Sequence, residues 1–558
     1  MIIGLDVGGT HTDAVLLNKT GIVKKTKVTT DSSDLFTTVL SALTCILKDS
    51  RPEKIERLVL STTLTTNAVV QKKVDKVGII VSAGPGIDPQ FYRTDEYFYA
   101  VSGSMDHRGR ERTPVNEKEI RQIGADLKTA GIKSIGIIGK FSPRNPAHEL
   151  TIESILKNDF EKIFLGHTVS GNLNFPRRIA TVHLNAAVFN MHKNFFDAVK
   201  KSLKEKGLHI PIQILKADGG TMNLESSMAF PGQAILSGPA ASVIGALTYA
   251  PEKKDTIVLD IGGTTTDIAL LAGKAPLLEP VGIKRGIYKS LIRSLKTRSI
   301  GIGGDSRVVI QNKEIKIGPE RTGPAMCFGG SDPTPTDALV VLDIIKTENR
   351  EASLRGIKTL ADQLGETVRE TAENIFEETC SVILNQAFKM IKQVNSKPVY
   401  TVHEFLEGYK IKPQRILLLG GPARDMKDII EQVSGIDTQV VMNSDVANAI
   451  GAALARTTCE VTLSADTEQG IVSAPEENYS ETINQSFTNR DAVEKARALL
   501  RKKAIQSGSK QENMEMEILE NQSFNIVRRF SPRGKIFRIK IQVKPGLIKG
   551  YTLQPAKG

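Results

Sequence analysis

Two copies of one short motif carry the residues of this chain that are best suited to chemistry. Residues 5–17 read LDVGGTHTDAVLL and residues 259–271 read LDIGGTTTDIALL. In each copy, apolar residues beside an Asp predict a buried strand, and the apolar residues after the next Asp predict a second strand. The Gly-Gly pair between them permits a tight turn whose backbone N–H groups can approach an anion. The motif is therefore typical of a phosphate-binding hairpin.

Acidic and hydroxyl side chains flank both turns. Asp6 and Asp260 end the first strand of each copy, and they are candidate Mg²⁺ ligands, directly or through water, because this hard cation prefers oxygen. The candidate contacts to the phosphates of a nucleotide are the turn residues Gly8, Gly9, Thr10, Thr12, Gly262, Gly263, Thr264 and Thr265. A single copy would equally fit an ordinary Gly-Gly hairpin. Two copies favour two similar domains that each offer a phosphate loop to one nucleotide.

Two further glycine-rich turns are candidates for close contact with the nucleotide. Gly238 precedes a Pro and a helix of small residues, which would allow a ligand to approach closely. Gly420 and Gly421 follow the buried strand of ILLLGGPAR (residues 416–424), where adenine and ribose could pass over bare backbone. Turns of this kind are common in α/β proteins, so the second site is weak support by itself.

The elements that must position these residues alternate between strands and helices. At 558 residues, the chain is too long for one core and should form two or three domains. Hydrophobic residues make up 40% and charged residues 24%, as in globular proteins. No apolar run approaches the length of a membrane span and no cleavable segment begins the chain, so we expect a cytoplasmic protein. Four scattered Cys residues without a CxxC pattern indicate neither a disulfide framework nor a zinc site.

The net charge of +12 is concentrated at the C-terminus. Residues 490–558 contain 16 Lys or Arg and 6 Asp or Glu, whereas the rest of the chain is nearly balanced. This distribution argues against nucleic-acid binding by the whole protein. The polar residues 463–489 predict a linker. The basic appendage after it should contain a helix at 491–505 and a hairpin turning at 531–534, with an apolar face formed by Phe537, Ile539, Ile541 and Val543.

Further motifs accompany the two hairpins. They are TTLTTNA at residues 62–68, NPAHE at 145–149, Arg178 with Thr181, Asn185 and Ala186, GPA at 238–240, and PTPTDA at 333–338. In this order they resemble the ATP-dependent hydantoinase A / 5-oxoprolinase family, within the actin/Hsp70/sugar-kinase ATPase superfold. The resemblance covers roughly residues 1–460.

The sequence departs from the family pattern at three places. Leu60 and Ser61 stand where the family has His-Gly, and Asn174, Phe175 and Pro176 stand where it has acidic residues. The Gly/Pro-rich run at residues 320–330 is also altered, to ERTGPAMCFGG. These departures lie outside the two Gly-Gly hairpins and leave the nucleotide-binding motifs intact.

The resemblance implies an α/β fold with two ribonuclease-H-like ATPase domains facing a nucleotide cleft, at residues 1–180 and 181–462, plus a small C-terminal α+β appendage at 490–558. It implies ATP and Mg²⁺ as cofactors. The implied reaction is hydrolysis of a cyclic amide, such as a hydantoin or 5-oxoproline, through phosphorylation of its carbonyl oxygen. Asp6, Asp13, Asp260 and Asp267 would be the catalytic carboxylates, with Asp13 and Asp267 orienting the loops or acting as bases. The expected partners are the ring substrate and a B-type hydantoinase subunit, and a homo-oligomer is compatible with the sequence.

Two alternatives remain open. The same phosphorylated intermediate would serve a small-molecule kinase or an ATP-dependent carboxylase subunit. The other alternative, which belongs to a different class of protein, is an ATP-driven switch that binds a protein partner. The sequence shows no apolar peptide-binding module after the ATPase core, which argues against this last class.

Overall fold

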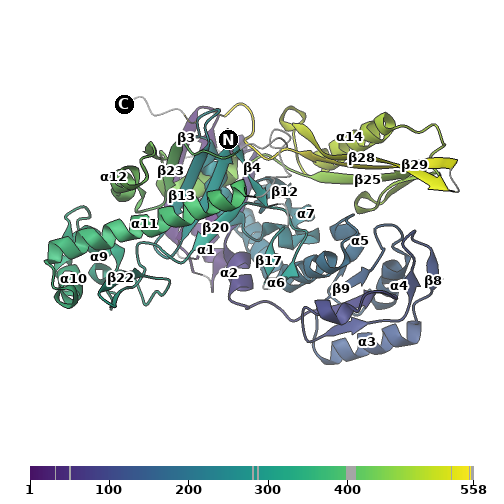
Figure 1. Ribbon diagram of the computed structural model, residues 1–558, viewed down its shortest axis with the longest axis horizontal. Helices are drawn as coiled ribbons and strands as arrows, with labels where there is room; N and C mark the ends of the chain where they lie inside the picture. The colour runs from purple at the N-terminus through teal and green to yellow at the C-terminus, as the bar shows by residue number, and fades with distance from the viewer. Residues whose placement is uncertain are drawn as a thin grey trace. The chain divides into compact units, whose positions relative to one another are not determined.

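The computed structural model describes residues 1–9, 11–31, 33–48, 52–279, 282–285, 288–396, 410–528, 531–551 and 553 (Figure 1). The chain forms two compact units. The first comprises Met1–Gly238, Glu279–Ser294 and Ala455–Tyr551, and the second consists chiefly of Pro239–Leu278 and Leu295–Leu454. The predicted domain boundary after residue 180 falls inside helix α6 (Phe175–Glu205), whose apolar side chains are shared among three cores of the first unit. The chain passes between units at residue 238 instead, because α6 packs entirely within the first one.

The first unit is built on a six-stranded sheet in the order β12-β11-β4-β1-β2-β3. Strands β1 (Ile2–Val7), β2 (His11–Asn18) and β3 (Gly21–Thr29) form an antiparallel meander. Strands β4 (Arg57–Thr62) and β11 (Ile212–Leu215) continue the sheet parallel to β1, and β12 (Thr221–Asn223) closes its edge. Helix α1 (Leu35–Leu47) and the second half of α6 contribute side chains to the same core as this sheet.

The second unit repeats this topology. Strands β13 (Thr256–Ile261) and β14 (Thr266–Ala272) form the hairpin, and β20 (Thr297–Ile300) pairs antiparallel with β14. Strands β23 (Arg415–Leu419) and β24 (Thr438–Val440) continue the sheet parallel to β13. Both sheets therefore have the strand order and directions of a ribonuclease-H-like fold. This confirms the α/β class and the duplicated fold that the sequence predicts.

Helices complete both units. In the second unit they are α8 (Ser237–Leu247), α9 (Pro335–Val341), α10 (Arg350–Leu364), α11 (Val368–Asn395), α12 (Ala423–Ser434) and α13 (Ala447–Leu454). In the first unit, a parallel sheet of β5 (Gly78–Ser82), β6 (Phe98–Ala100), β9 (Ser134–Gly139) and β10 (Lys162–Leu165) accompanies α3 (Glu117–Thr129) and α4 (Ala147–Leu156). Across the described part of the chain, every helix is too short or too polar to cross a membrane.

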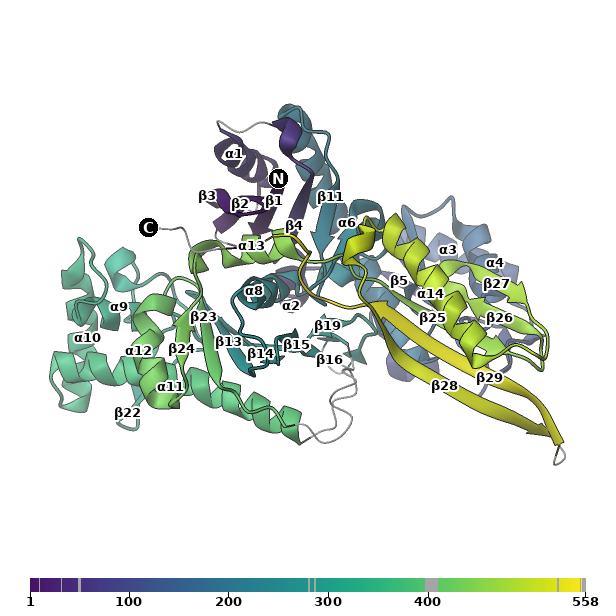
Figure 2. The same ribbon diagram turned by 90° about the horizontal axis from the view of Figure 1, so that it is seen from above.

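The C-terminal region corrects two sequence-based predictions. The predicted linker, residues 463–489, is wrong: these residues lie in strands β25 (Glu460–Asp466), β26 (Ile471–Ala474) and β27 (Tyr479–Thr482), and they lead into α14 (Asn489–Gln506). These strands form one antiparallel sheet with the long hairpin of β28 (Met516–Arg528) and β29 (Ser531–Val543), as Figure 2 shows.

The apolar residues that make this region a folded part of the first unit come from both sides of the predicted linker boundary. Val461 and Leu463 share a core with Phe537 and Ile539, and the predicted apolar face of the hairpin is confirmed as buried. The predicted turn at residues 531–534 is wrong, because these residues already pair with β28. The polar composition of residues 463–489 resembles that of a linker, because strands with one face exposed to solvent carry few large apolar residues.

Candidate active site

The β1–β2 hairpin of the first unit closes with a backbone hydrogen bond from Gly8 N to the carbonyl oxygen of His11, at 3.0 Å. A Cβ atom at Gly8 would lie 2.8 Å from that oxygen, so the turn requires glycine there. Gly9 is exposed beyond it, and Thr10 lies outside the described residues. Asp6 is buried at the end of β1 and accepts a hydrogen bond from the Ser61 hydroxyl at the end of β4. Ser61, a departure from the family pattern, therefore orients the candidate carboxylate.

The remaining predicted residues of this hairpin have structural partners. Asp13 lies opposite Asp6 in the register and forms an ion pair with Lys27, at 2.7 Å. Thr12 is fully buried, and its hydroxyl lies 2.8 Å from that of Thr30. Thr12 therefore holds β2 in place, and its hydroxyl does not face outward toward a ligand.

The β13–β14 hairpin of the second unit has the same form. Gly262 N donates to the Thr265 carbonyl oxygen at 2.9 Å, and Gly263, Thr264 and Thr265 are exposed in the turn. A second loop, to which the sequence assigned no role, supports this turn. Its backbone N–H groups at Gly304 and Asp305 donate to the carbonyl oxygens of Gly262 and Gly263, at 3.0 and 2.7 Å.

Two carboxylates face each other across this second hairpin. Asp260 accepts a hydrogen bond from the Ser242 hydroxyl at 2.5 Å and lies opposite Asp267 in the register. Burial, together with the charge of Asp260, raises the pKa of Asp267 to about 7. A cation would relieve the repulsion of this pair. Mg²⁺ is usually held by one or two carboxylates plus water and phosphate oxygens, so the donor set fits that ion.

The two glycines of the third candidate turn differ in their surroundings. Gly420 has φ +91°, and a Cβ atom there would lie 2.1 Å from the Ile261 carbonyl oxygen, so the turn after β23 packs against the end of β13. A Cβ atom at Gly421 would meet nothing within 4 Å. The structure thus brings Gly420 next to the Asp260 strand and leaves the backbone at Gly421 open.

Gly238 lies beside the TTLTTNA segment. A Cβ atom on Gly238 would lie 2.6 Å from the Thr63 methyl group. The neighbouring Ser237 hydroxyl donates to the Thr62 carbonyl oxygen at 2.8 Å, and Leu236 N donates to the Thr66 hydroxyl at 2.8 Å. Gly238 therefore serves close packing at the carboxyl end of β4.

The NPAHE motif and Arg178 form a buried structural network. Glu149 accepts hydrogen bonds from the backbone N–H groups of Gly139 and His167, at 2.7 and 2.9 Å. Arg178 is completely buried and donates to the carbonyl oxygens of Gly139 and Lys140, at 2.9 and 2.5 Å. These motif residues hold the end of β9, so they position the fold and do not face a ligand.

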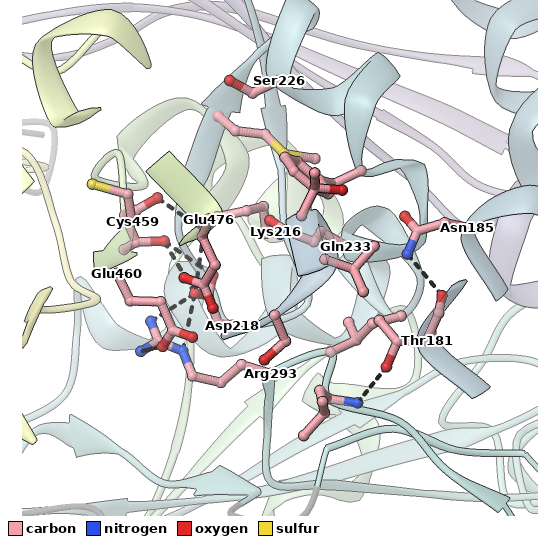
Figure 3. Close-up of a pocket in the computed structure, with 18 of the residues that line it drawn as sticks. Thr181, Asn185, Lys216, Asp218, Ser226, Gln233, Arg293, Cys459, Glu460 and Glu476 are labelled. Atoms are coloured by element: carbon pink, nitrogen blue, oxygen red, sulfur yellow. Dashed lines mark hydrogen bonds and ion pairs between the residues drawn. The ribbon is translucent and has the colours of Figure 1, made fainter. Parts of the chain in front are cut away.

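A charged pocket of about 120 Å³ lies within the first unit (Figure 3). Its charged lining residues are Lys216, Asp218, Arg293, Glu460, Glu476 and Lys503, and Thr181 and Asn185 contribute polar side chains. The sequence analysis assigned no site here, because these charges are far apart in the chain and only the fold collects them.

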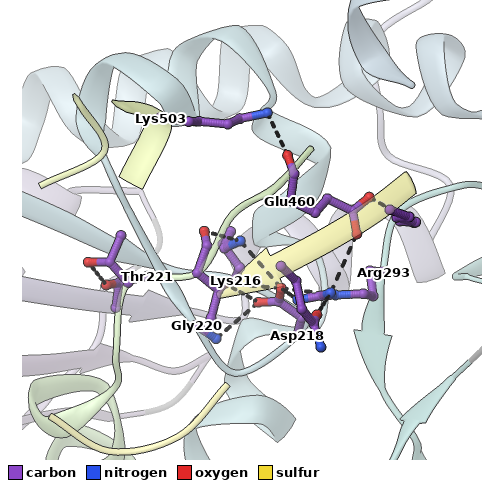
Figure 4. Close-up of polar contacts among 11 residues, drawn as sticks. Lys216, Asp218, Gly220, Thr221, Arg293, Glu460 and Lys503 are labelled. Carbon is purple, nitrogen blue, oxygen red and sulfur yellow. Dashed lines mark hydrogen bonds and ion pairs between the residues drawn. The ribbon is translucent and has the colours of Figure 1, made fainter. Parts of the chain in front are cut away.

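The charges in this pocket are paired with one another (Figure 4). Asp218 accepts from Arg293 Nη2 at 2.7 Å and lies 3.3 Å from Lys216 Nζ. Although burial alone would raise it, these two cations lower the pKa of Asp218 well below its usual range. In the same way, Lys540 and Arg293 lower the pKa of Glu460 to about 2. The pocket is therefore lined by a neutralised network.

Two ribonuclease-H-like units, each with a Gly-Gly hairpin flanked by carboxylates, define the fold of actin-like ATPases and sugar kinases. Residues 2–160 match the hydantoinase/oxoprolinase N-terminal region, and residues 178–461 match the hydantoinase/oxoprolinase domain. The chain belongs to the hydantoinase/oxoprolinase family, as the resemblance of its motifs implied.

Three relatives illustrate the range of this family. The chain is 27% identical to a 5-oxoprolinase of Saccharomyces cerevisiae, over 70% of this chain and 32% of that protein. It is 24% identical to caprolactamase subunit alpha of Pseudomonas jessenii, over 67% of this chain and 60% of that one. It is 25% identical to the acetone carboxylase beta subunit of Xanthobacter autotrophicus, over 67% and 60%. The chain thus spans less than two thirds of the length of these curated relatives.

Solved structures with these names have the same fold. A nucleotide-free acetone carboxylase structure matches with a TM-score of 0.74 and 18% identity, over 100% of this chain and 89% of that one. The ATP-dependent caprolactamase of Pseudomonas jessenii matches with a TM-score of 0.73 and 18% identity, over the same shares. At this identity, the likeness establishes the fold alone.

Proposed function

We propose that this protein uses Mg·ATP to hydrolyse a cyclic amide of the hydantoin or 5-oxoproline type. The observation that carries the proposal is the duplicated Gly-Gly hairpin, which in each unit places a carboxylate at the end of its first strand. Asp6 and Asp260 would hold Mg²⁺ directly or through water. The turn residues would contact phosphates through backbone N–H groups, and Gly420 and Gly421 would lie against the adenosine.

The chemistry is dictated by the weakness of an amide carbonyl as an electrophile. The ring carbonyl oxygen attacks the γ-phosphorus, an O–P bond forms, and the bond from phosphorus to the bridging oxygen breaks, releasing ADP. Water then adds to the activated ring carbon, and the C–N bond breaks as the nitrogen takes a proton, which leaves an acyl phosphate on the opened chain. A second water adds to this acyl carbon and phosphate leaves, so the products are ADP, phosphate and an open-chain amino acid. Backbone N–H groups of the turns would neutralise the charge that develops on the phosphoryl group, and Mg²⁺ held by Asp6 and Asp260 would supply further positive charge.

A carboxylase or kinase role is the alternative, and the acetone carboxylase relative favours the carboxylase form. The first step would be the same phosphorylation of a carbonyl oxygen. The two roles differ in the second step, because a carboxylase transfers the activated carbon to CO₂ or bicarbonate, and a kinase releases the phosphorylated product.

A second subunit belongs to the proposal. Two of the relatives are named as subunits, caprolactamase alpha and acetone carboxylase beta. We propose that this chain also works with a B-type hydantoinase subunit, which would supply the ring-opening step after phosphorylation.

The test is ATP turnover measured with a panel of cyclic amides, with and without a co-expressed B-type subunit. The proposal expects ADP release that is stimulated by one ring and is stoichiometric with ring opening. Accumulation of a phosphorylated small molecule would favour the kinase alternative. Absence of Mg²⁺-dependent ATP binding in calorimetry would contradict every version.

A further inference from the structure

The pocket of the first unit lies at the functional edge of its sheet. Lys216 directly follows β11, Ser61 lies near the end of β4, and Asp6 lies near the end of β1. These three strands are parallel, so their carboxyl ends share one edge. Adjacent strands are about 4.8 Å apart, so strand β11, which leads to Lys216 in the pocket lining, lies about 10 Å from strand β1, which carries Asp6. Ligands of open α/β sheets bind beyond this edge.

The charged groups of the pocket do not make it an ion site. Asp218 is already bound by Lys216, Arg293 and the Thr458 hydroxyl, and Gly220 N donates to it at 3.0 Å. Binding a free ion would require breaking these contacts in a buried place, where an uncompensated charge is costly. The pocket therefore suits the amide part of a ligand, which carries no charge.

Gln233 supplies the polar group that such a ligand would meet. Within the described residues, its side-chain amide has no hydrogen-bond partner, and Figure 3 shows it among the lining residues without a dashed line. The side chain is partly exposed, so a ligand can reach it. By contrast, the Asn185 and Thr181 side chains are occupied: Asn185 accepts from Gly232 N at 3.0 Å, and Thr181 accepts from Leu291 N at 2.8 Å.

The backbone around Gln233 is firmly held. Its carbonyl oxygen accepts a hydrogen bond from Ala217 N at 2.8 Å, and its own N–H donates to the Phe230 carbonyl oxygen at 3.0 Å. Asn185 fixes the preceding residue, Gly232, from helix α6. The held backbone fixes the point from which the Gln233 side chain starts, so its amide can reach only the space near the pocket.

We propose that this pocket binds the amide edge of the substrate ring, and that Gln233 is the residue that recognises it. A cyclic amide has one N–H and one carbonyl oxygen on the same edge. The Gln233 side chain offers the complementary acceptor and donor, so the two amides can form a pair of parallel hydrogen bonds. The carbonyl oxygen keeps a second lone pair for the phosphoryl transfer.

The size of the pocket is consistent with this assignment. A volume of about 120 Å³ has room for several water-sized groups, which is consistent with one small ring. The inference rests on the proposed function, since it assumes a cyclic amide substrate.

The experiment compares two ligands on the whole protein in the presence of a non-hydrolysable ATP analogue. Calorimetry measures binding of 2-pyrrolidinone and of N-methyl-2-pyrrolidinone, which lacks the N–H. We expect the wild-type protein to bind the first about 10-fold or more tightly than the second, because one paired hydrogen bond is lost. Gln233→Met, which keeps the length of the side chain, should bind both weakly and equally. Gln122→Met, on the exposed face of α3, is the matched control and should behave as wild type.

The outcomes separate the inference from the function on which it rests. If a cyclic amide stimulates ATP turnover and Gln233→Met retains the preference for the N–H ligand, the inference is overturned and the proposed function stands. If neither 2-pyrrolidinone, 5-oxoproline nor hydantoin binds or stimulates turnover, both fall. Gln233→Glu, which keeps an acceptor but loses the amide donor, provides a second variant if the Met variant does not fold. It too should lose affinity for the ring, and wild-type affinity would overturn the inference.

Discussion

Asp260 and Asp267 face each other across the β13–β14 hairpin, and the charge of Asp260 adds to burial in raising the pKa of Asp267 to about 7. The pair couples the candidate metal site to pH. Protonated Asp267 can donate a hydrogen bond next to the turn, and ionised Asp267 adds a second negative charge for a cation. The state of this pair should therefore control both the stability of the second unit and its affinity for Mg²⁺.

Asp267→Asn should change how stability depends on pH. An acid with a pKa raised on folding binds an extra proton in the native state, so wild-type stability falls as pH rises from about 4 through 7. The Asn variant lacks this loss. We expect the two proteins to melt alike near pH 4 and the variant to melt higher at pH 8, in scans without Mg²⁺. Parallel pH profiles for the two proteins would show that Asp267 titrates normally.

Asp260→Asn should reduce ATP turnover by about 10²–10³-fold, because it removes a full charge beside the transferring phosphate while keeping the shape of the side chain. Melting should change little or rise, since the repulsion with Asp267 disappears. Asp255→Asn is the matched control at the opposite end of β13, where the carboxylate accepts from Lys412 N at 2.8 Å. That variant should melt lower and keep its turnover per folded molecule. Near-normal turnover in Asp260→Asn would remove this residue from the site.

Gly420→Ala and Gly421→Ala should have opposite signatures. At Gly420 the added methyl would collide with the Ile261 carbonyl oxygen and force a positive φ on Ala, so folding should be weakened. At Gly421 the methyl has space, so melting should match wild type. If adenosine lies against this backbone, the Gly421 variant should still bind ATP less tightly in calorimetry. Unchanged ATP affinity in a folded Gly421 variant would place the adenosine elsewhere.

Arg293→Met should destabilise the first unit by about 3–5 kcal/mol, because it removes a cation from buried Asp218 and from half-buried Glu460. Arg121→Met, which breaks an exposed pair with Glu117 on α3, is the matched control and should cost less than about 1 kcal/mol. Denaturant titration of both variants measures the difference. Equal effects would mean that the buried network adds no more than a surface pair.

The stability that the charged pocket residues contribute should fall as the pH is lowered. The pKa values of Asp218 and Glu460 are lowered on folding, so their contribution is present above the unfolded values near 4 and is lost as pH falls toward 2. The wild-type protein should lose this stability between those limits, and Arg293→Met should lose less of it.

Local spacing was enough to predict the hairpins. The Gly-Gly turns at residues 8–9 and 262–263 and the opposed carboxylates at 6 and 13 depend on neighbours in the chain, and the structure has them in that arrangement. The duplicated α/β fold was predictable from the repetition of one motif. Thr12 was predicted as a ligand contact, because its pattern cannot reveal that Thr30 occupies its hydroxyl from the next strand.

The sequence by itself determined the two hairpins, the α/β class and the family, because these depend on residue types at short, fixed spacings. Only the tertiary structure decided that residues 463–489 are strands, because β25 pairs with β29, about 70 residues further along the chain, and β26 and β27 extend the sheet from β25. It alone gathered Lys216, Asp218, Arg293 and Glu460 into one pocket with Gln233. Single charged or amide residues form no periodic sequence pattern from which their neighbours could be predicted. Their positions in the pocket therefore depend on how distant segments of the chain fold against one another.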